Sequence, residues 1–463
     1  MIERTRNPQL PGRIAAFLAV WACLALTGRC DQAVAAGLPS QTNASERRPN
    51  IVWIWADNLA YADLSCYGSD SVRTPVIDAL ADGGVKLTQY YVAHVVCSPS
   101  RAALLTGRQP FRVGIVDVLR PDGPSGIPDD EITLAEALGQ LGYATMAIGK
   151  WHLGDRPQYL PKQHGFDGYF GLPYSMDMLP TVLYRDDQII EQLPGDKVAD
   201  ITERYTAEAI RFVRDNRDRP FFLYLSHTIP HPPLNIPDAE EDDSRPLYDA
   251  AIEYLDRQTG VLLDELDRLS LSNDTLVVFT SDNGPMSRGG NTGGLRGRIG
   301  ESYEGGVRVP FVARWPGHIP PGQVVETPAI AYDMFPTLLT WAGGSLPENR
   351  VYDGQDIRPL LTGDGEFERS RPFYWVQGDK VTAIRDGRWK LHVAHRGKKL
   401  PAVELYDIHS DARESRNLAD DNPGIAKRLS AQVADFQQQV PKVWSLRYPV
   451  RDPEKLNSGV RRE

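Results

Sequence analysis

The sequence predicts an α/β fold built on a large mixed, mostly parallel sheet, and two patterns support this. Short continuous runs of β-branched and aromatic residues end in polar residues, as buried parallel strands do. These runs are 50–56, 144–148, 221–226, 275–281 and 307–313. Segments in which apolar residues recur at helical spacing separate them, as in 201–212 and 252–269. Strands that alternate with helices are typical of an α/β sandwich.

Polar side chains directly follow four of these predicted strands. They are Asp57, Lys150, His227 and Asp282. In open α/β sheets, ligands bind at the carboxyl ends of the strands. We therefore expect these four strand ends to form one site.

The pattern changes after about residue 365. A strand-like run at 373–376 is followed by 381–391, where Asp386 and Gly387 join two alternating segments as the turn of a hairpin. A helix is expected over 422–440. These elements predict a smaller α+β unit with a short antiparallel sheet.

The length of the chain also favours two domains. Single hydrophobic cores stop growing at roughly 250–300 residues, and this chain has 463. We expect a larger domain over 37–365 and a smaller C-terminal domain with a tail over 366–463.

The N-terminus has the pattern of a secretory signal. Basic residues up to Arg13 precede an apolar run over 14–26, and small residues lead to Ala36. The run is too short for a membrane span, which needs about 20 residues. We expect cleavage near Ala36, so that 1–36 is a signal peptide and the mature chain is periplasmic or secreted, with no membrane span. An uncleaved anchor is the alternative, and Arg29 before Cys30 argues against a lipoprotein.

The charge of the chain excludes one class of partner. It has 51 Lys and Arg against 61 Asp and Glu, a formal net charge of −10. No overall positive field is available to hold nucleic acid or an anionic membrane. An anionic ligand must be bound by a local group of cations.

Cys97 is the cysteine whose surrounding sequence suggests a function. After signal cleavage it remains with Cys66, and a bridge between them is one interpretation. Pro99 and Gly107 suit the first turn and the end of a helix, which would begin near Cys97. A cysteine at a helix start with Arg101 one turn later predicts a thiolate nucleophile of low pKa. A buried structural cysteine is the alternative.

The segment Cys-Ser-Pro-Ser-Arg over 97–101, followed by Leu-Leu-Thr-Gly-Arg over 104–108, closely resembles the signature of type I sulfatases. Other matching segments follow in the same order over most of 48–445. The resemblance implies an alkaline-phosphatase-like fold and oxidation of Cys97 to formylglycine by a maturation enzyme. The hydrated aldehyde of that family attacks the sulfur of a sulfate ester. Arg101 would then lie beside the hydrated group.

Two Asp-Asn pairs predict a cation site. They are Asp57 with Asn58 and Asp282 with Asn283. Four oxygen donors suit Ca²⁺ or Mg²⁺. Taken alone, each pair is more typical of a turn. The segments 56–61 and 281–284 resemble the metal-binding segments of the sulfatases. The resemblance implies one Ca²⁺, or Mg²⁺, per chain, with Cys97 as a further ligand and with a Lewis-acid role.

Three further residues are assigned by the same resemblance. Lys150 and His152 lie in a Gly-Lys-Trp-His-Leu-Gly segment. Lys150 would bind sulfate, and His152 would act beside the formylglycine. By its chemistry His152 is expected to titrate near neutrality. His231 would contact the ester oxygen and protonate the leaving alcohol. His227 is expected to support the site from behind, and His94 to pack in the core.

The sequence departs from the family pattern at two positions. Asn58 stands where many members have a second aspartate, so the cation site has one charge fewer. Ile299 occupies the position of a lysine that binds sulfate in many members. Our hypothesis is that Arg296 or Arg298 replaces part of that charge, or that the pocket serves a substrate that needs less of it. The segment 303–310 matches the family as scaffold.

The resemblance implies a sulfatase that hydrolyses a carbohydrate or aryl sulfate to an alcohol and inorganic sulfate. A phosphonate or phosphodiester hydrolase of the same superfamily is the nearest alternative. A catalytically idle relative that binds sulfated glycans is another, because of Asn58 and Ile299. The expected partners are the sulfated substrate and the maturation enzyme.

Overall fold

The computed structural model describes residues 48–193, 199–234, 236–237, 246–286, 289–395 and 398–441. They belong to a single compact unit. The predicted signal peptide lies outside the described residues. None of the helices within the described ranges is long and apolar enough to cross a membrane.

A ten-stranded mixed sheet forms the centre of the described chain. Its central strands β9, β1, β8, β4 and β5 are parallel, and antiparallel strands extend it on both sides. The order is β12 (Gln323–Val325), β2 (Val85–Leu87), β11 (Phe311–Arg314), β9 (Thr275–Ser281), β1 (Asn50–Ala56), β8 (Phe221–Ser226), β4 (Ala144–Lys150), β5 (Gly168–Leu172), β6 (Val182–Arg185) and β7 (Gln188–Gln192). The predicted α/β class is confirmed.

Strand β1 is apolar throughout because both faces of the sheet are covered. Trp53 and Trp55 pack into one hydrophobic core, and the alternate residues Val52 and Ile54 pack into another. Side chains on a strand alternate between its faces, so a strand buried on both sides needs an unbroken apolar run.

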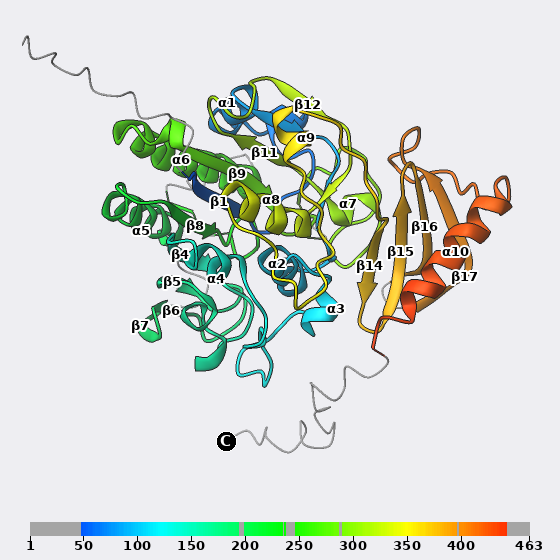
Figure 1. Cartoon of the computed structure of the whole chain (residues 1–463), viewed down its shortest axis with the longest axis horizontal. Coiled ribbons are helices and arrows are strands. Elements are labelled where there is room, and N and C mark those ends of the chain that lie inside the picture. Colours follow the sequence, from blue (N-terminus) through cyan, green and yellow to red (C-terminus); the bar gives the residue numbers. More distant parts are fainter. Residues whose placement is uncertain are drawn as a thin grey trace, which may run out of the picture. The chain divides into compact units, whose positions relative to one another are not determined.

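Helices cover the two faces of the sheet (Figure 1). The helices α1 (Pro75–Asp82), α5 (Ile201–Asp215) and α6 (Leu247–Arg268) pack into one core. The helices α2 (Cys97–Thr106), α4 (Leu134–Gly139) and α8 (Met334–Trp341) pack into the other. Shorter helices are α3 (Pro110–Val113), α7 (Glu304–Val307) and α9 (Arg358–Thr362), with 3₁₀ turns at Ser65–Tyr67, Pro157–Tyr159, Pro161–His164, Ser272–Asp274 and Ala331–Asp333.

The predicted strand over 307–313 is wrong in one respect. Pro310 divides it, because proline cannot donate a hydrogen bond to a sheet ladder. The first part is β10 (Arg308–Val309), which joins a three-stranded sheet with β3 (Tyr90–Tyr91) and β13 (Ala329–Ile330). The second part, β11, pairs antiparallel with β9. The run therefore supplies two short strands to two sheets.

The predicted C-terminal antiparallel sheet is confirmed. Its strands, in spatial order, are β14 (Phe373–Gln377), β15 (Lys380–Asp386), β16 (Trp389–His395) and β17 (Lys398–Asp407). The predicted turn joins β15 to β16, and Gly387 adopts a φ of 58° there. Helix α10 (Pro423–Gln437) packs on β15 and β16 (Figure 1). The domain boundary near residue 365 stays a prediction.

A buried cluster of charges ties this sheet to the rest of the chain. Lys390 of β16 lies with its Nζ 2.8 Å from Glu304 Oε1 and 3.4 Å from Glu414 Oε1. The Tyr91 hydroxyl donates to Glu304 at 2.6 Å. Burial acts to raise the pKa of Glu304, but Lys390 and nearby arginines lower it to about 2. Glu304 is therefore ionised, and Lys390 is the main charge that stabilises the buried carboxylate.

The substitution Glu304→Ala tests this cluster. It leaves the Lys390 ammonium buried with less compensation, and breaking a buried pair from one side costs about 3–5 kcal/mol. We expect the free energy of unfolding, measured by urea denaturation, to fall by about that amount. Glu366→Ala on an exposed site is the matched control, with an expected change within about 0.5 kcal/mol. Equal free energies of unfolding for the two variants would show that the Glu304–Lys390 pair does not stabilise the fold.

Candidate active site

The four predicted strand ends meet at one edge of the sheet. Strands β9, β1, β8 and β4 are neighbours in this order, and their registers align the last residues of each strand. Asp282, Asp57, His227 and Lys150 follow or end these strands and are fully buried. The structure therefore brings the four predicted strand ends together at one edge of the sheet.

Two cations compensate the buried carboxylate of Asp57. The Lys150 Nζ lies 2.7 Å from Asp57 Oδ2, and the Arg101 Nη2 lies 3.9 Å from Oδ1. Burial acts to raise the pKa of Asp57, but Lys150, His231 and Arg101 together hold it below its usual value. Asp57 is therefore an ionised group.

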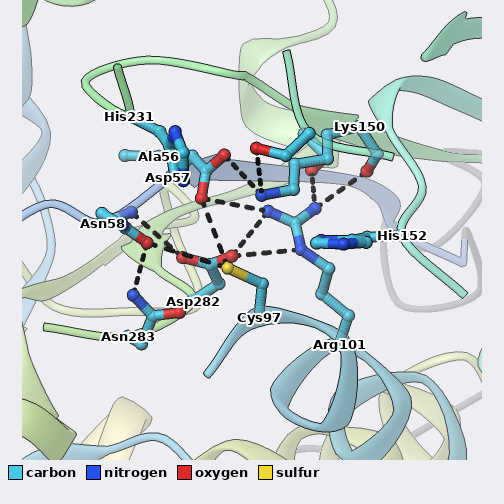
Figure 2. A network of polar contacts seen from close by, with 12 residues as sticks. Ala56, Asp57, Asn58, Cys97, Arg101, Lys150, His152, His231, Asp282 and Asn283 are labelled. Carbon is cyan, nitrogen blue, oxygen red and sulfur yellow. Dashed lines mark hydrogen bonds and ion pairs between the residues drawn. The ribbon is translucent and has the colours of Figure 1, made fainter. Parts of the chain in front are cut away.

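Arg101 of α2 connects three of the strand ends (Figure 2). Its Nη2 and Nε donate to Asp282 Oδ2 at 2.7 and 3.1 Å. Its Nη1 donates to the carbonyl of Lys150 at 2.8 Å and also to the hydroxyl of Ser226. Burial opposes the charged form, but Asp282 and other neighbours raise the pKa of Arg101 above its usual value. A planar fork of donors is needed for these contacts, and lysine does not offer one.

Cys97 is the first residue of α2, and its thiol points at the strand ends (Figure 2). Its Sγ lies 3.8 Å from both Asp57 Oδ1 and Asn58 Oδ1. Burial, and then the negative charge of Asp282, raise the pKa of this thiol well above its usual value. The interpretation of Cys97 as a low-pKa thiolate is therefore wrong, because burial and the nearby carboxylates disfavour the thiolate. Cys97 and Cys66 are both free, so the alternative of a bridge between them is also wrong.

The donors around Cys97 fit a hard cation. Ligand atoms of Asp57, Cys97 and Asp282 all lie within 4.8 Å of one another. Asn58, at a φ of 67°, directs its Oδ1 to the same place. The Oδ1 of buried Asn283 makes no hydrogen bond within the described part of the chain. Carboxylate and amide oxygens are the ligands that Ca²⁺ and Mg²⁺ prefer. Burial and the adjacent Asp57 raise the pKa of Asp282, so a cation would relieve a real repulsion.

Close backbone approach sets the position of Lys150. The preceding residue, Gly149, has a φ of 95°, and a Cβ atom there would lie 1.8 Å from the carbonyl oxygen of Ser226. Only glycine fits this place. The Lys150 ammonium also donates to the Ser175 hydroxyl at 3.3 Å.

His152 differs from its prediction. Burial, Lys150 and Arg101 lower its pKa well below the usual value, so the ring is neutral rather than titrating near neutrality. Its Nε2 lies 3.0 Å from the carbonyl of Leu119. A carbonyl can only accept, so Nε2 carries the hydrogen and Nδ1 keeps its lone pair. Among the described residues, Nδ1 has no hydrogen-bond partner.

The other two histidines lie beside the site in different ways. His231 is 7% exposed, and its Nδ1 lies 2.5 Å from the carbonyl of Pro232, to which it donates. The ring lies next to Asp57, and Nε2 is the ring nitrogen that the Pro232 carbonyl does not engage (Figure 2). His227 is fully buried next to the ring of Tyr205, with 6.3 Å between ring centroids. Its place behind the strand ends agrees with a supporting role.

The structure removes one of the two arginines from our hypothesis about Ile299. Arg296 Nη1 donates to the Tyr406 hydroxyl at 2.7 Å, and its guanidinium stacks on Tyr303 at 3.8 Å. Arg296 also pairs with Glu404 at 3.2 Å. It is held by the C-terminal sheet, so it does not replace the family lysine. Arg298 stays the candidate.

Sequence reasoning missed the two serines of the site. Ser226 contacts Arg101, and Ser175 contacts Lys150. The position of Ser226 at the end of a predicted strand, just before His227, is the signal that could have found it. Ser175 lies in a loop without a motif, and the sequence holds no comparable signal for it.

Comparison with known families decides what this arrangement is. A family model described as Sulfatase matches residues 49–345. The chain belongs to the sulfatase family. A second model, described as N-sulphoglucosamine sulphohydrolase, C-terminal, matches residues 300–439 of this sulfatase.

Similar proteins are named sulfatases. Human arylsulfatase A is 40% identical over 83% of this chain and 85% of its own. Canine N-acetylgalactosamine-6-sulfatase is 36% identical over 74% of this chain and 71% of its own. Human steryl-sulfatase is 33% identical over 69% and 70%. This sulfatase is accordingly a sulfuric ester hydrolase.

Solved structures agree with the predicted alkaline-phosphatase-like fold. A structure described as Ps i-CgsB in complex with k-i-k-neocarrahexaose superposes with a TM-score of 0.77 at 31% identity, over 86% of this chain and 94% of its own. A phosphonate monoester hydrolase of Agrobacterium radiobacter superposes with a TM-score of 0.63 at 23% identity, over 85% and 96%. The latter shares the fold alone.

The buried ring of His227 predicts a dependence of stability on pH. Burial lowers its pKa to about 3. Between pH 6 and pH 4 the unfolded chain binds a proton here and the folded chain does not, so stability falls as the pH falls. The variant His227→Gln should lose this contribution. Its free energy of unfolding should vary less steeply with pH, by about 1.4 kcal/mol per pH unit over that range.

Urea denaturation at pH 4, 5 and 6 measures this slope. His409→Gln, at an exposed site, is the control and should keep the slope of the unmodified protein. Parallel curves for His227→Gln and the unmodified protein would show that the ring is protonated in the folded state.

Proposed function

We propose that this sulfatase acts through a formylglycine formed from Cys97 by a maturation enzyme. One observation carries the proposal. The Cys97 thiol is buried against two carboxylates, where it is a poor thiolate, yet it points at the joint position of Asp57, Asp282, Arg101 and Lys150. A residue so placed needs a different chemical form to act as a nucleophile. Hydrated formylglycine supplies a hydroxyl that attacks sulfur.

We propose that Asp57, Asn58, Asp282, Asn283 and residue 97 hold one Ca²⁺ or Mg²⁺. The ion would supply Lewis-acid chemistry to a sulfate oxygen. The amide of Asn58 gives the site one negative charge fewer than a second aspartate would, and we expect weaker cation binding as a result. The Arg101 guanidinium keeps Asp282 in place through its paired hydrogen bonds.

The other side chains have roles in binding and proton transfer. The Lys150 ammonium offers positive charge to the sulfate group, and Ser175 helps to orient it. The neutral His152 has a lone pair at Nδ1 and accepts the proton of the residue-97 hydroxyl. His231 is anchored at Nδ1, and in its imidazolium form it donates the Nε2 proton to the oxygen of the leaving alcohol. General acid catalysis of this kind typically contributes about 10²–10⁴-fold.

The substrate is proposed to be a sulfate ester of a carbohydrate or an aryl alcohol. Relatives named for aryl, amino-sugar and steryl sulfates support this range of leaving groups. We further propose that the chain is exported, after cleavage near Ala36, and acts in the periplasm or outside the cell. The basic residues and the apolar run of the N-terminus support this location.

The mass of the tryptic peptide 87–101, from protein purified out of its own host, tests the modification. We expect loss of sulfur and gain of oxygen at Cys97. The variant Cys97→Ala should show neither the mass change nor sulfate release from 4-nitrophenyl sulfate. Cys66→Ala is the matched control and should keep both.

An unmodified thiol in protein that releases sulfate would contradict the formylglycine proposal. Turnover of 4-nitrophenyl phosphate or its diester above that of the sulfate ester would favour the phosphohydrolase alternative. Tight binding of a sulfated glycan with no sulfate release under saturating Ca²⁺ would favour the idle relative.

A further inference from the structure

A cavity borders the residues that directly precede Cys97 and has no role in the chemistry described so far. Its volume is about 530 Å³. It lies between the segment that precedes α2, the loop after α3, the segment around Ile299 and the turn between β14 and β15. The residues used below are His94, Val96, Asp117, Ile299, Gln377 and Asp379, which all line it.

Three residues that line the cavity are Val96, Asp117 and Ile299. Val96 and Asp117 are close in sequence to residues of the proposed active site. Val96 directly precedes Cys97 and caps helix α2. Asp117 lies two residues before Leu119, whose carbonyl is bonded to His152. Ile299 holds the position at which the family pattern has a sulfate-binding lysine. The cavity therefore borders the segment that leads into Cys97 and the loop that holds His152 through Leu119.

The lining is negatively charged. Asp117 and Asp379 are carboxylates, and none of the described lining residues is a lysine or an arginine. His94 adds no positive charge, because burial lowers its pKa to about 3 against the opposing effect of the Val376 backbone. Ile299 adds an apolar side chain to this lining. An anionic group would meet repulsion here.

The polar atoms of the lining are mainly acceptors. Gln377 donates from Nε2 to the carbonyl of Gly300 at 3.0 Å, which fixes its amide. Its Oε1 is buried and makes no hydrogen bond within the described ranges. The carboxylates can only accept. Val96 and Ile299 supply apolar surface beside these acceptors. This combination suits a sugar ring, which offers hydroxyl donors and C–H faces.

We propose that this cavity binds the alcohol portion of the substrate and selects a hydroxyl-rich alcohol without further negative charge. Asp117 and Asp379 accept hydrogen bonds from its hydroxyls, and Ile299 packs on its ring. The substrate is then a monosulfated neutral sugar or sugar end, rather than a polysulfated or uronic-acid-rich chain. This inference rests on the proposed function, because it assumes that sulfate is hydrolysed at Cys97.

The test compares kcat/KM for two matched substrates, N-acetylglucosamine 6-sulfate and its counterpart with a second sulfate on the same ring. We expect the monosulfate to be favoured by about tenfold or more, and this ratio to shrink at high salt because charge repulsion is screened. The double variant Asp117→Asn, Asp379→Asn should reduce the ratio to below about threefold. Asp364→Asn, exposed after α9, is the control and should leave the ratio unchanged.

Failure of this inference is separable from failure of the proposed function. Hydrolysis of 4-nitrophenyl sulfate reports the proposed function alone. If that ester is hydrolysed and the disulfate is the equal or better sugar substrate, the assignment of the cavity is overturned. A second measurement needs no turnover. Calorimetry compares the affinity for the neutral desulfated sugar with the affinity for the same sugar that keeps only its second sulfate. Stronger binding of the anionic sugar would overturn the assignment, and the reverse order would support it.

Discussion

Mutual compensation of buried charges at the carboxyl ends of β9, β1, β8 and β4 is the constraint on which the site depends. Asp57 and Asp282 are fully buried, and so are Lys150 and Arg101. Burying an isolated charge costs free energy, and removing one partner of a buried ion pair leaves the other charge uncompensated. The four groups come from three strand ends and one helix, so the fold must hold these elements together. Gly149 allows β4 to approach the backbone of Ser226 on β8 closely enough for that.

The same charges decide the state of the reactive groups. Burial, and then the carboxylates that could bind a cation, raise the pKa of the Cys97 thiol, while burial, and then Lys150 and Arg101, lower the pKa of His152. A protonated thiol is unsuited to cysteine-type nucleophilic catalysis, which uses the thiolate. A neutral imidazole can accept a proton, as the proposal of a modified residue 97 requires of His152. The environment therefore agrees with the chemistry of the sulfatase family, and the acidic cavity beside it extends the account to the alcohol.

Much of this arrangement is predictable from the sequence, because it depends on local patterns. Continuous apolar runs placed β1, β8 and β9 within their observed bounds, and the polar residues after them marked the site. Pro99 and Gly107 marked a helix that does end at Thr106 before Gly107. The C-terminal hairpin followed from the Asp-Gly turn.

The parts that were wrong depend on tertiary surroundings. Cys97 and His152 have shifted pKa values first because they are buried, and then because of charges such as Asp282 for Cys97 and Lys150 and Arg101 for His152. Burial depends on the tertiary structure, and no local pattern reports it. Arg296 is captured by Tyr406 and Glu404 of the C-terminal sheet, which sequence spacing does not reveal. Pro310 was a visible signal for the division of the strand over 307–313, but the pairing of its two parts with different sheets was not.

The measurement that tests the central claim most directly is anomalous diffraction from crystals of the mature protein grown with Ca²⁺. The account predicts one strong peak enclosed by oxygens of Asp57, Asn58, Asp282 and Asn283, with residue 97 beside it, and loss of that peak in Asp282→Asn. Absence of a peak there, with Asp57 and Asp282 still paired only to Lys150 and Arg101, would contradict the claim that these buried carboxylates are assembled to hold a cation.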